Sequence, residues 1–158
     1  MLATILPLIP TCQSIQILQL QTEKEMLRVL AVFNSIVFDY IVRLKMAGLD
    51  LTQTIIKQIP MPAVERFEDV ICLKNVKATI ETHINSRICK LYEKDIRLNG
   101  LFEDIETYKI TEDLSRKEMI ADIDYLVAQL YGLDRQGLRK IAYSFDKYYN
   151  KEEVENWF

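Results

Sequence analysis

The most regular hydrophobic pattern in the chain extends from Thr22 to Gly48. Apolar residues recur there at three- and four-residue spacing, which predicts an α-helix, and other apolar residues fill most of the remaining circumference. Thr22 and Glu25 have the spacing of a capping box, and Gly48 is placed where glycine ends helices. A helix that is apolar nearly all round lies in a core or a membrane. Because Arg28 and Asp39 interrupt the apolar run, a membrane span is excluded, and we expect one buried central helix.

Short apolar segments precede this helix. Leu2 to Leu6 and Ile15 to Leu20 predict two strands, which would form an N-terminal β-hairpin or the edge of a partial sheet packed on the central helix. An apolar strand that starts directly after Met1 suggests that the chain belongs to a longer polypeptide. After the helix, Pro60 and Pro62 predict an extended boundary. The segment 51–57 between them is compatible with either a short helix or a strand.

The pattern from about residue 68 onwards predicts several helices, and most of their ends carry capping residues. Periodicity over 68–95 predicts a long amphipathic helix. Ser115 with Glu118 forms a second capping box, Gly132 is placed for a Schellman motif, and Asp134 and Asn150 can cap two further helices. The predicted fold is therefore mainly α (α+β), a bundle of about five helices. Residues 1–62 would form one subdomain of short strands plus the central helix, and residues 63–158 a C-terminal helical subdomain.

Charge and cysteine content narrow the class of protein. The chain has 158 residues and a net charge of −3, which is no overall signature of nucleic-acid binding. Residues 1–60 nevertheless carry five Lys/Arg against four acids, whereas the other 98 residues carry 15 against 19. An anion-binding surface is therefore expected in the first third. Three cysteines without CxxC spacing indicate reduced thiols. The N-terminus lacks a basic signal-peptide region, so we expect a cytoplasmic protein without a membrane anchor.

Candidate catalytic chemistry is sparse. No glycine-rich phosphate loop is present, and the single histidine is expected to be a partly buried or surface residue. Adjacent acidic residues are interpreted as solvated helix faces, and paired tyrosines as core or interface residues. These residues are His83, Asp122, Asp124, Glu152, Glu153, Tyr125, Tyr131, Tyr148 and Tyr149. We therefore expect no catalytic residue, no metal site and no cofactor in this chain.

One polar constellation suggests nucleic-acid contact. Three cations bracket a loop that contains three short polar side chains. A cationic rim can meet phosphates while polar loop residues approach base edges, although cations near the end of a helix also offset its dipole without any ligand. The predicted DNA-binding residues are Arg43, Lys45, Asp50, Thr52, Gln53 and Lys57.

Two elements of the chain resemble a known family, and the first of them consists of two segments. Phe33 to Lys45 reads FNSIVFDYIVRLK, and Ile55 to Pro62 reads IIKQIPMP. Together they are similar to the pattern LNSxxFDYxxRxK, a glycine turn and KQLPxP near the C-terminus of large adenine-specific DNA methyltransferases of the type II G restriction–modification class. Ile123 to Arg135, IDYLVAQLYGLDR, resembles the closing LDAxVAxLYGL element of the same enzymes. Both elements occur in the family's order and the resemblance covers about residues 2–145. Where the family often has two glycines, this chain has Ala47 and Gly48.

The resemblance implies a target-recognition region, which reads double-stranded DNA and presents an adenine to the methyltransferase domain of the same polypeptide. Residues 1–62 would then be a partial target-recognition subdomain. The family's NPPY/F catalytic motif and its S-adenosylmethionine-binding sheet are absent from the sequence. The expected function is therefore non-catalytic, with S-adenosylmethionine bound elsewhere in a parent enzyme that can also carry restriction endonuclease activity. Asn34, Phe38 and Tyr40 would then pack against the recognition sheet.

Two alternatives of different classes stay open. The first is a helical protein–protein interaction module that uses the acidic C-terminal half and does not bind DNA. The second is a small enzyme with carboxylate chemistry.

Overall fold

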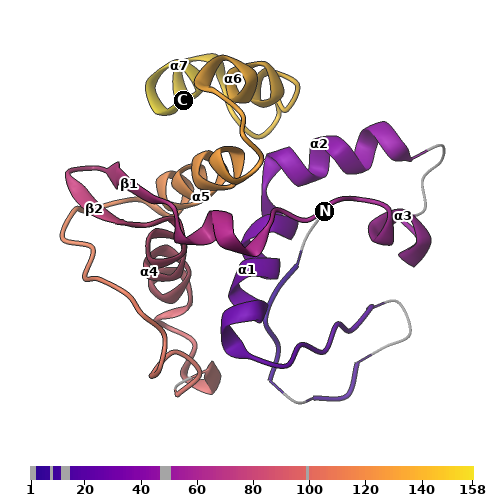
Figure 1. Cartoon of the computed structure of the whole chain (residues 1–158), viewed down its shortest axis with the longest axis vertical. Helices are drawn as coiled ribbons and strands as arrows, with labels where there is room; N and C mark the ends of the chain where they lie inside the picture. Colours follow the sequence, from indigo (N-terminus) through magenta and orange to yellow (C-terminus); the bar gives the residue numbers. More distant parts are fainter. Residues whose placement is uncertain (1–2, 8, 12–14, 47–50, 99) are drawn as a thin grey trace.

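The computed structural model describes residues 3–7, 9–11, 15–46, 51–98 and 100–158. Over these ranges the chain forms seven α-helices, two short 3-10 helices and one two-stranded antiparallel sheet, so the mainly helical α+β prediction is confirmed (Figure 1). The elements are α1 (Glu23–Asn34), α2 (Ile36–Lys45), α3 (Gln53–Lys57), η1 (Val64–Glu68), β1 (Val70–Leu73), β2 (Val76–Thr79), α4 (Ile80–Tyr92), η2 (Ile96–Leu98), α5 (Arg116–Leu130), α6 (Arg135–Tyr143) and α7 (Lys151–Trp157).

The predicted central helix is two helices, α1 and α2, which meet at Ser35. Ser35 has an extended backbone, with φ −73° and ψ 147°. Its hydroxyl donates to the Val32 carbonyl at 2.8 Å and accepts from the Phe38 N–H at 3.2 Å, so one side chain ends α1 and caps α2. The prediction of one continuous helix is wrong because apolar periodicity runs on through the kink while the break depends on a single serine. Gly48, its expected end, lies outside the described residues.

The small sheet lies at a different place from the predicted one. β1 and β2 pair antiparallel with Val70 opposite Thr79 and Leu73 opposite Val76. The two residues between them, Lys74 and Asn75, have φ of 50° and 64°, which is the left-handed conformation of a two-residue hairpin turn. The predicted helix over 68–95 is therefore wrong in its first part, and α4 begins only at Ile80.

The predicted N-terminal strands are also wrong within the described residues. Residues 3–7 and 15–20 form no strand. The first of these segments is instead tied to α1 by its backbone, since Asn34 accepts from the Ala3 N–H and donates to the Ala3 carbonyl, both at 2.9 Å. The second is mostly exposed, with Ile17 69% and Leu18 59% accessible.

The helix ends predicted in the second half are confirmed. Ser115 and Glu118 form a capping box at the start of α5, and Asn150 and Glu153 form another at α7. Gly132 has φ 73°, and the Leu133 N–H reaches the Ala128 carbonyl at 2.9 Å, which is the long hydrogen bond of a Schellman motif. Asp134 then caps α6 through the Gly137 N–H at 2.7 Å. Each of these helix ends depends on hydrogen bonds between residues three to five positions apart, so a local sequence pattern is enough to predict it.

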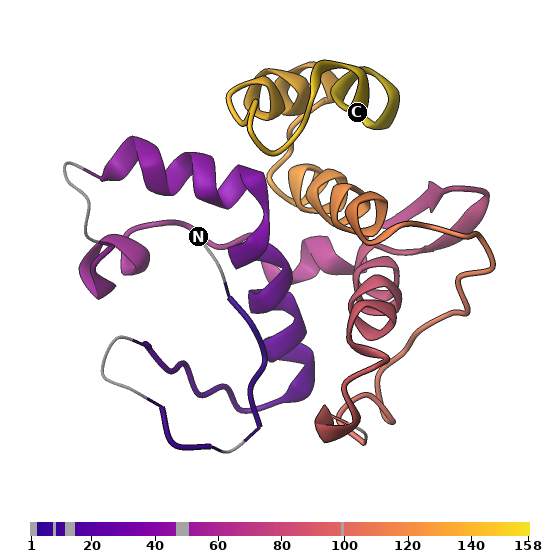
Figure 2. The ribbon, with the colours of Figure 1, turned by 180° about the vertical axis from the view of Figure 1, so that it is seen from behind.

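The helices pack around one shared core. α1 lies beside α4, α5 contacts both, and α2 contacts α5 and α6, so the packing crosses the predicted division at residue 62. Figures 1 and 2 show α6 and α7 above α5, with α3 beside α2 at one side. Leu27, Phe38 and Leu126 are fully buried in this core. Among the described residues, no helix is long and apolar enough to cross a membrane.

Candidate nucleic-acid interface and the buried polar clusters

The predicted DNA-binding residues that the structure describes lie on or next to α2 and α3. These two helices contact each other on one side of the molecule (Figure 1). Lys45 at the end of α2 and Lys57 at the end of α3 are exposed, and so is Gln53. Asp50 lies outside the described residues. The structure therefore places the described members on one pair of helices, and their role in DNA contact stays a prediction.

Two of the predicted residues have structural partners. Arg43 forms an ion pair with Asp39 at 2.9 Å, one turn earlier on α2, and its guanidinium carbon lies 4.4 Å from the centre of the Phe145 ring. Thr52 caps α3, since its hydroxyl accepts from the Ile55 N–H at 3.3 Å. Among the predicted cations, Lys45 and Lys57 are thus better placed than Arg43 to meet a phosphate.

Two of the segments that resemble methyltransferase elements, Phe33–Lys45 and Ile123–Arg135, meet at a buried joint. Asp124 on α5 accepts a hydrogen bond from the Ile36 N–H, the first of α2, at 2.9 Å, and a second from the Tyr149 hydroxyl at 2.6 Å. Asp124 is 1% exposed. One carboxylate therefore holds the kink between α1 and α2, the middle of α5 and the segment before α7. Asn34 and Ser35, beside this kink, bind backbone groups, so their hydrogen bonds are structural.

Burial perturbs this carboxylate. Desolvation raises the pKa of Asp124 to about 7, although the hydrogen bonds from Tyr149 and Ile36 oppose the rise. The pKa of Tyr149 is also raised, first by burial and then by the neighbouring Asp124. Asp124 was expected on a solvated face, and that interpretation is wrong.

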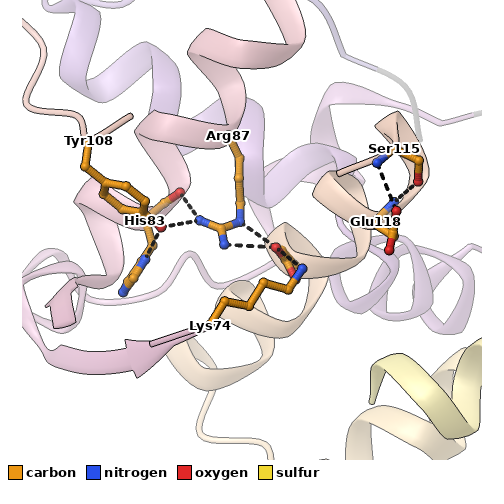
Figure 3. Close-up of polar contacts among 7 residues, drawn as sticks. Lys74, His83, Arg87, Tyr108, Ser115 and Glu118 are labelled. Carbon is orange, nitrogen blue, oxygen red and sulfur yellow. Dashed lines mark hydrogen bonds and ion pairs between the residues drawn. The ribbon is translucent and has the colours of Figure 1, made fainter. Parts of the chain in front are cut away.

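A second buried cluster forms around Asp122, two residues earlier on α5. Its Oδ2 accepts from Nε and Nη2 of Arg87, both at 2.9 Å, and from Nζ of Lys74 at 2.9 Å (Figure 3). The Arg87 side chain is 2% exposed and the Asp122 side chain 11%. The solvated interpretation is therefore wrong for Asp122 as well. This ion pair joins the hairpin turn, α4 and α5.

The same arginine organises His83 and Tyr108. Nη1 of Arg87 donates to the Tyr108 hydroxyl at 2.8 Å, and that hydroxyl lies 2.7 Å from Nδ1 of His83 (Figure 3). Nε2 of His83 faces the Ile71 carbonyl at 3.4 Å. A neutral ring with its proton on Nε2 satisfies all of these contacts, because Tyr108 then accepts from Arg87 and donates to Nδ1. Burial lowers the pKa of His83, and Arg87 lowers it further.

This cluster has little room for a substrate. The adjoining cavity, lined by Lys74, Arg87 and Tyr108 among others, has a volume of about 40 Å³, which is enough for roughly one water molecule. The Arg87 and Asp122 charges compensate each other. We therefore interpret the cluster as a clamp that fixes the hairpin and residues 106–112 to the helices. The sequence signal that could have found it is the polar residues at positions 83 and 87 on the apolar side of α4.

Comparisons with protein-family models, with curated proteins and with solved structures find no match for this chain. Among the residues that the structure describes, no group of three or more His, Cys, Asp or Glu side chains is arranged to hold a metal ion.

Proposed function

We propose that this chain is a non-catalytic segment of an adenine-specific DNA methyltransferase of the restriction–modification type, contributing to DNA target recognition and scaffolding. Methyl transfer and S-adenosylmethionine binding would then belong to another part of a parent polypeptide. The partner would be double-stranded DNA, bound together with that methyltransferase domain.

One observation carries the proposal. Two of the segments that resemble the methyltransferase elements, far apart in sequence, are joined through Asp124 and the N-terminus of α2. Asp124 and the Ile36 N–H, which lie in these two segments, thus have a common structural task, which is to set the direction in which α2 leaves the core. α2 ends at Lys45, and Lys57 ends the neighbouring α3, so this joint determines where the two exposed cations lie.

Salt dependence of DNA binding tests the proposal directly. We expect the chain to bind a fluorescein-labelled duplex of mixed sequence weakly, with an affinity that falls steeply between low and moderate salt, because each neutralised phosphate releases a counterion. Fluorescence anisotropy at several salt concentrations measures the affinity and the slope. Absence of duplex binding at low salt would contradict the proposal that this chain itself contacts DNA.

Single substitutions assign the contacts. Lys45→Ala and Lys57→Ala should each reduce the slope of log K against log salt by about one. Arg43→Ala should leave the slope unchanged, because Arg43 is already engaged by Asp39 and Phe145. Lys147→Ala, at an exposed lysine between α6 and α7, is the matched control. An equal effect of all four substitutions would indicate only a general charge effect.

A protein-interaction role is the second candidate. Ile15, Ile17 and Leu18 are between 48% and 69% exposed, which is unusual for three apolar residues within four positions. A chain that binds no duplex but forms a stable complex with a separately expressed methyltransferase domain would favour this candidate.

A further inference from the structure

An open groove lies where the C-terminal end of α4, η2 and the N-terminal end of α5 come together. The space over it is about 580 Å³, and the groove is shallow and largely open to solvent. Three cations line it, Lys94, Arg97 and Arg116, with Asp95 as the only acid among the lining residues. Residues 61–158 carry more acids than cations, so this concentration of positive charge runs against the local composition.

The ion pairs within the groove leave two cations available. Arg97 holds the Asp95 carboxylate through Nε at 2.8 Å and Nη2 at 2.6 Å, so these two charges compensate each other. Lys94 and Arg116 are exposed and form no ion pair with any residue in the described ranges. Arg116 is also the first residue of α5, a helix of 15 residues whose N-terminus is closed by the Ser115–Glu118 capping box.

The remaining lining provides hydroxyl groups and apolar surface. The Tyr92 and Thr4 hydroxyls lie 3.0 Å apart, and Tyr92 also accepts from the Ile5 N–H at 3.4 Å. The Thr4 hydroxyl also donates to the Ile5 carbonyl at 3.4 Å, so both hydroxyl protons have acceptors within the chain. Ile96 is 78% exposed beside them. The groove thus combines positive charge with an apolar surface.

We propose that this groove binds a nucleotide unit of a nucleic-acid strand, with a backbone phosphate taken by Lys94 and Arg116 and the sugar or base packed on Ile96. The choice of a nucleic acid rests on the proposed function, which requires DNA, and packing of a base on Ile96 further requires a nucleotide that is not paired in a duplex. An acidic peptide would use the two cations but would gain little from the apolar surface. The groove is separate in sequence from the cations on α2 and α3.

The test compares two probes and two double variants. The probes are a labelled oligothymidylate of about ten nucleotides and a mixed-sequence duplex, both followed by anisotropy at low salt. For Lys94→Ala/Arg116→Ala we expect about a fivefold or greater loss of oligothymidylate affinity and a salt slope smaller by about one. Lys140→Ala/Lys147→Ala removes the same charge at two exposed positions away from the groove and serves as control. Circular dichroism checks that both variants fold.

The outcomes separate this inference from the proposed function. Equal oligothymidylate affinities for the groove variant and the control variant would overturn the groove assignment, as would failure of the unmodified chain to bind oligothymidylate. Competition by polyglutamate as strong as by unlabelled oligothymidylate would overturn the nucleotide assignment. Binding of duplex, and its loss in Lys45→Ala/Lys57→Ala, decides the proposed function independently of all three results.

Discussion

Two aspartates on α5, Asp122 and Asp124, are both buried but are compensated in different ways. Asp122 accepts hydrogen bonds from two cations, Arg87 and Lys74. Asp124 accepts from an uncharged tyrosine hydroxyl and from the first N–H of α2. A helix N-terminus carries about half a positive charge and favours a carboxylate there. For Asp124 this is outweighed by desolvation, which raises its pKa to about 7.

The different partners of the two carboxylates give them different roles in the stability of the fold. Asp122 and Arg87 form an ion pair in which removal of either member leaves the other charge buried and uncompensated. Among the described residues, Asp124 has no cation as a partner. When its carboxyl group is protonated, the added proton can displace one of the two donors, Tyr149 or the Ile36 N–H. We therefore expect the Asp122 cluster to control stability at all ordinary pH values, and Asp124 to make stability depend on pH.

Arg87→Ala should give the largest effect. It removes a side chain that is 2% exposed and leaves Asp122 with only the partly exposed Lys74. We expect a loss of about 3–5 kcal/mol in the free energy of unfolding, the usual result of breaking a buried pair from one side. Urea denaturation followed by circular dichroism measures it.

Two variants sharpen this prediction. Arg97→Ala breaks an exposed pair with Asp95 and should shift the midpoint little. The double variant Arg87→Met/Asp122→Leu should be more stable than Arg87→Ala, because both charges leave the interior together. A double variant less stable than the single one would show that the clamp stabilises the fold beyond the compensation of its two charges.

Asp124→Asn should change how stability depends on pH. The folded-state pKa of Asp124 lies above the ordinary carboxyl value of 3.8, so the folded chain binds more protons than the unfolded chain between about pH 4 and pH 7. This group therefore lowers the stability as the pH rises through that window and has no further effect above it. The difference between pKa values of 3.8 and about 7 sets an upper limit of about 4 kcal/mol.

The measurement compares unfolding free energies of the two proteins from pH 4.5 to 8. The asparagine keeps an oxygen for the Ile36 N–H, and the other titrating groups, His83 among them, cancel in the difference between the two curves. We expect the free energy of unfolding of the wild type minus that of the variant to decrease as the pH rises. Parallel curves would show that Asp124 has an ordinary pKa, and that the hydrogen bonds from Tyr149 and Ile36 offset its burial.

The sequence predicts the helix ends whose hydrogen bonds join residues only a few positions apart. Thr22 caps α1, Ser115 and Glu118 form their box, and Gly132 ends α5, because these residues act on backbone groups three to five positions away. The sequence does not predict the β1–β2 hairpin, because its local signals are weak. Its turn uses Lys74 and Asn75 without a glycine, and the apolar residues of β1 and β2 continue into the helical pattern of α4.

The buried clusters could not be predicted in the same way. Asp122 and Asp124 stand on either side of Ile123 and resemble the solvated acids of other helices. Only the packing of α5 against α4 and α2 brings Arg87 and the Ile36 N–H to them. The groove illustrates the same limit, since Arg116 joins Lys94 there across more than twenty residues of sequence. Contacts between distant segments carry no local pattern.

Lys74→Asn should give the smallest effect and tests whether both cations of the Asp122 cluster matter equally. Lys74 has φ 50°, and asparagine tolerates this left-handed conformation, so the turn itself is preserved. The Lys74 side chain is 32% exposed, and Asp122 keeps both hydrogen bonds from Arg87. We therefore expect a loss of less than about 1 kcal/mol in the same urea experiment. A loss of stability close to that of Arg87→Ala would mean that Asp122 requires both cations. The contrast between Asp122 and Asp124 would then depend on the number of cations beside the carboxylate, and not on the burial of the Arg87 charge alone.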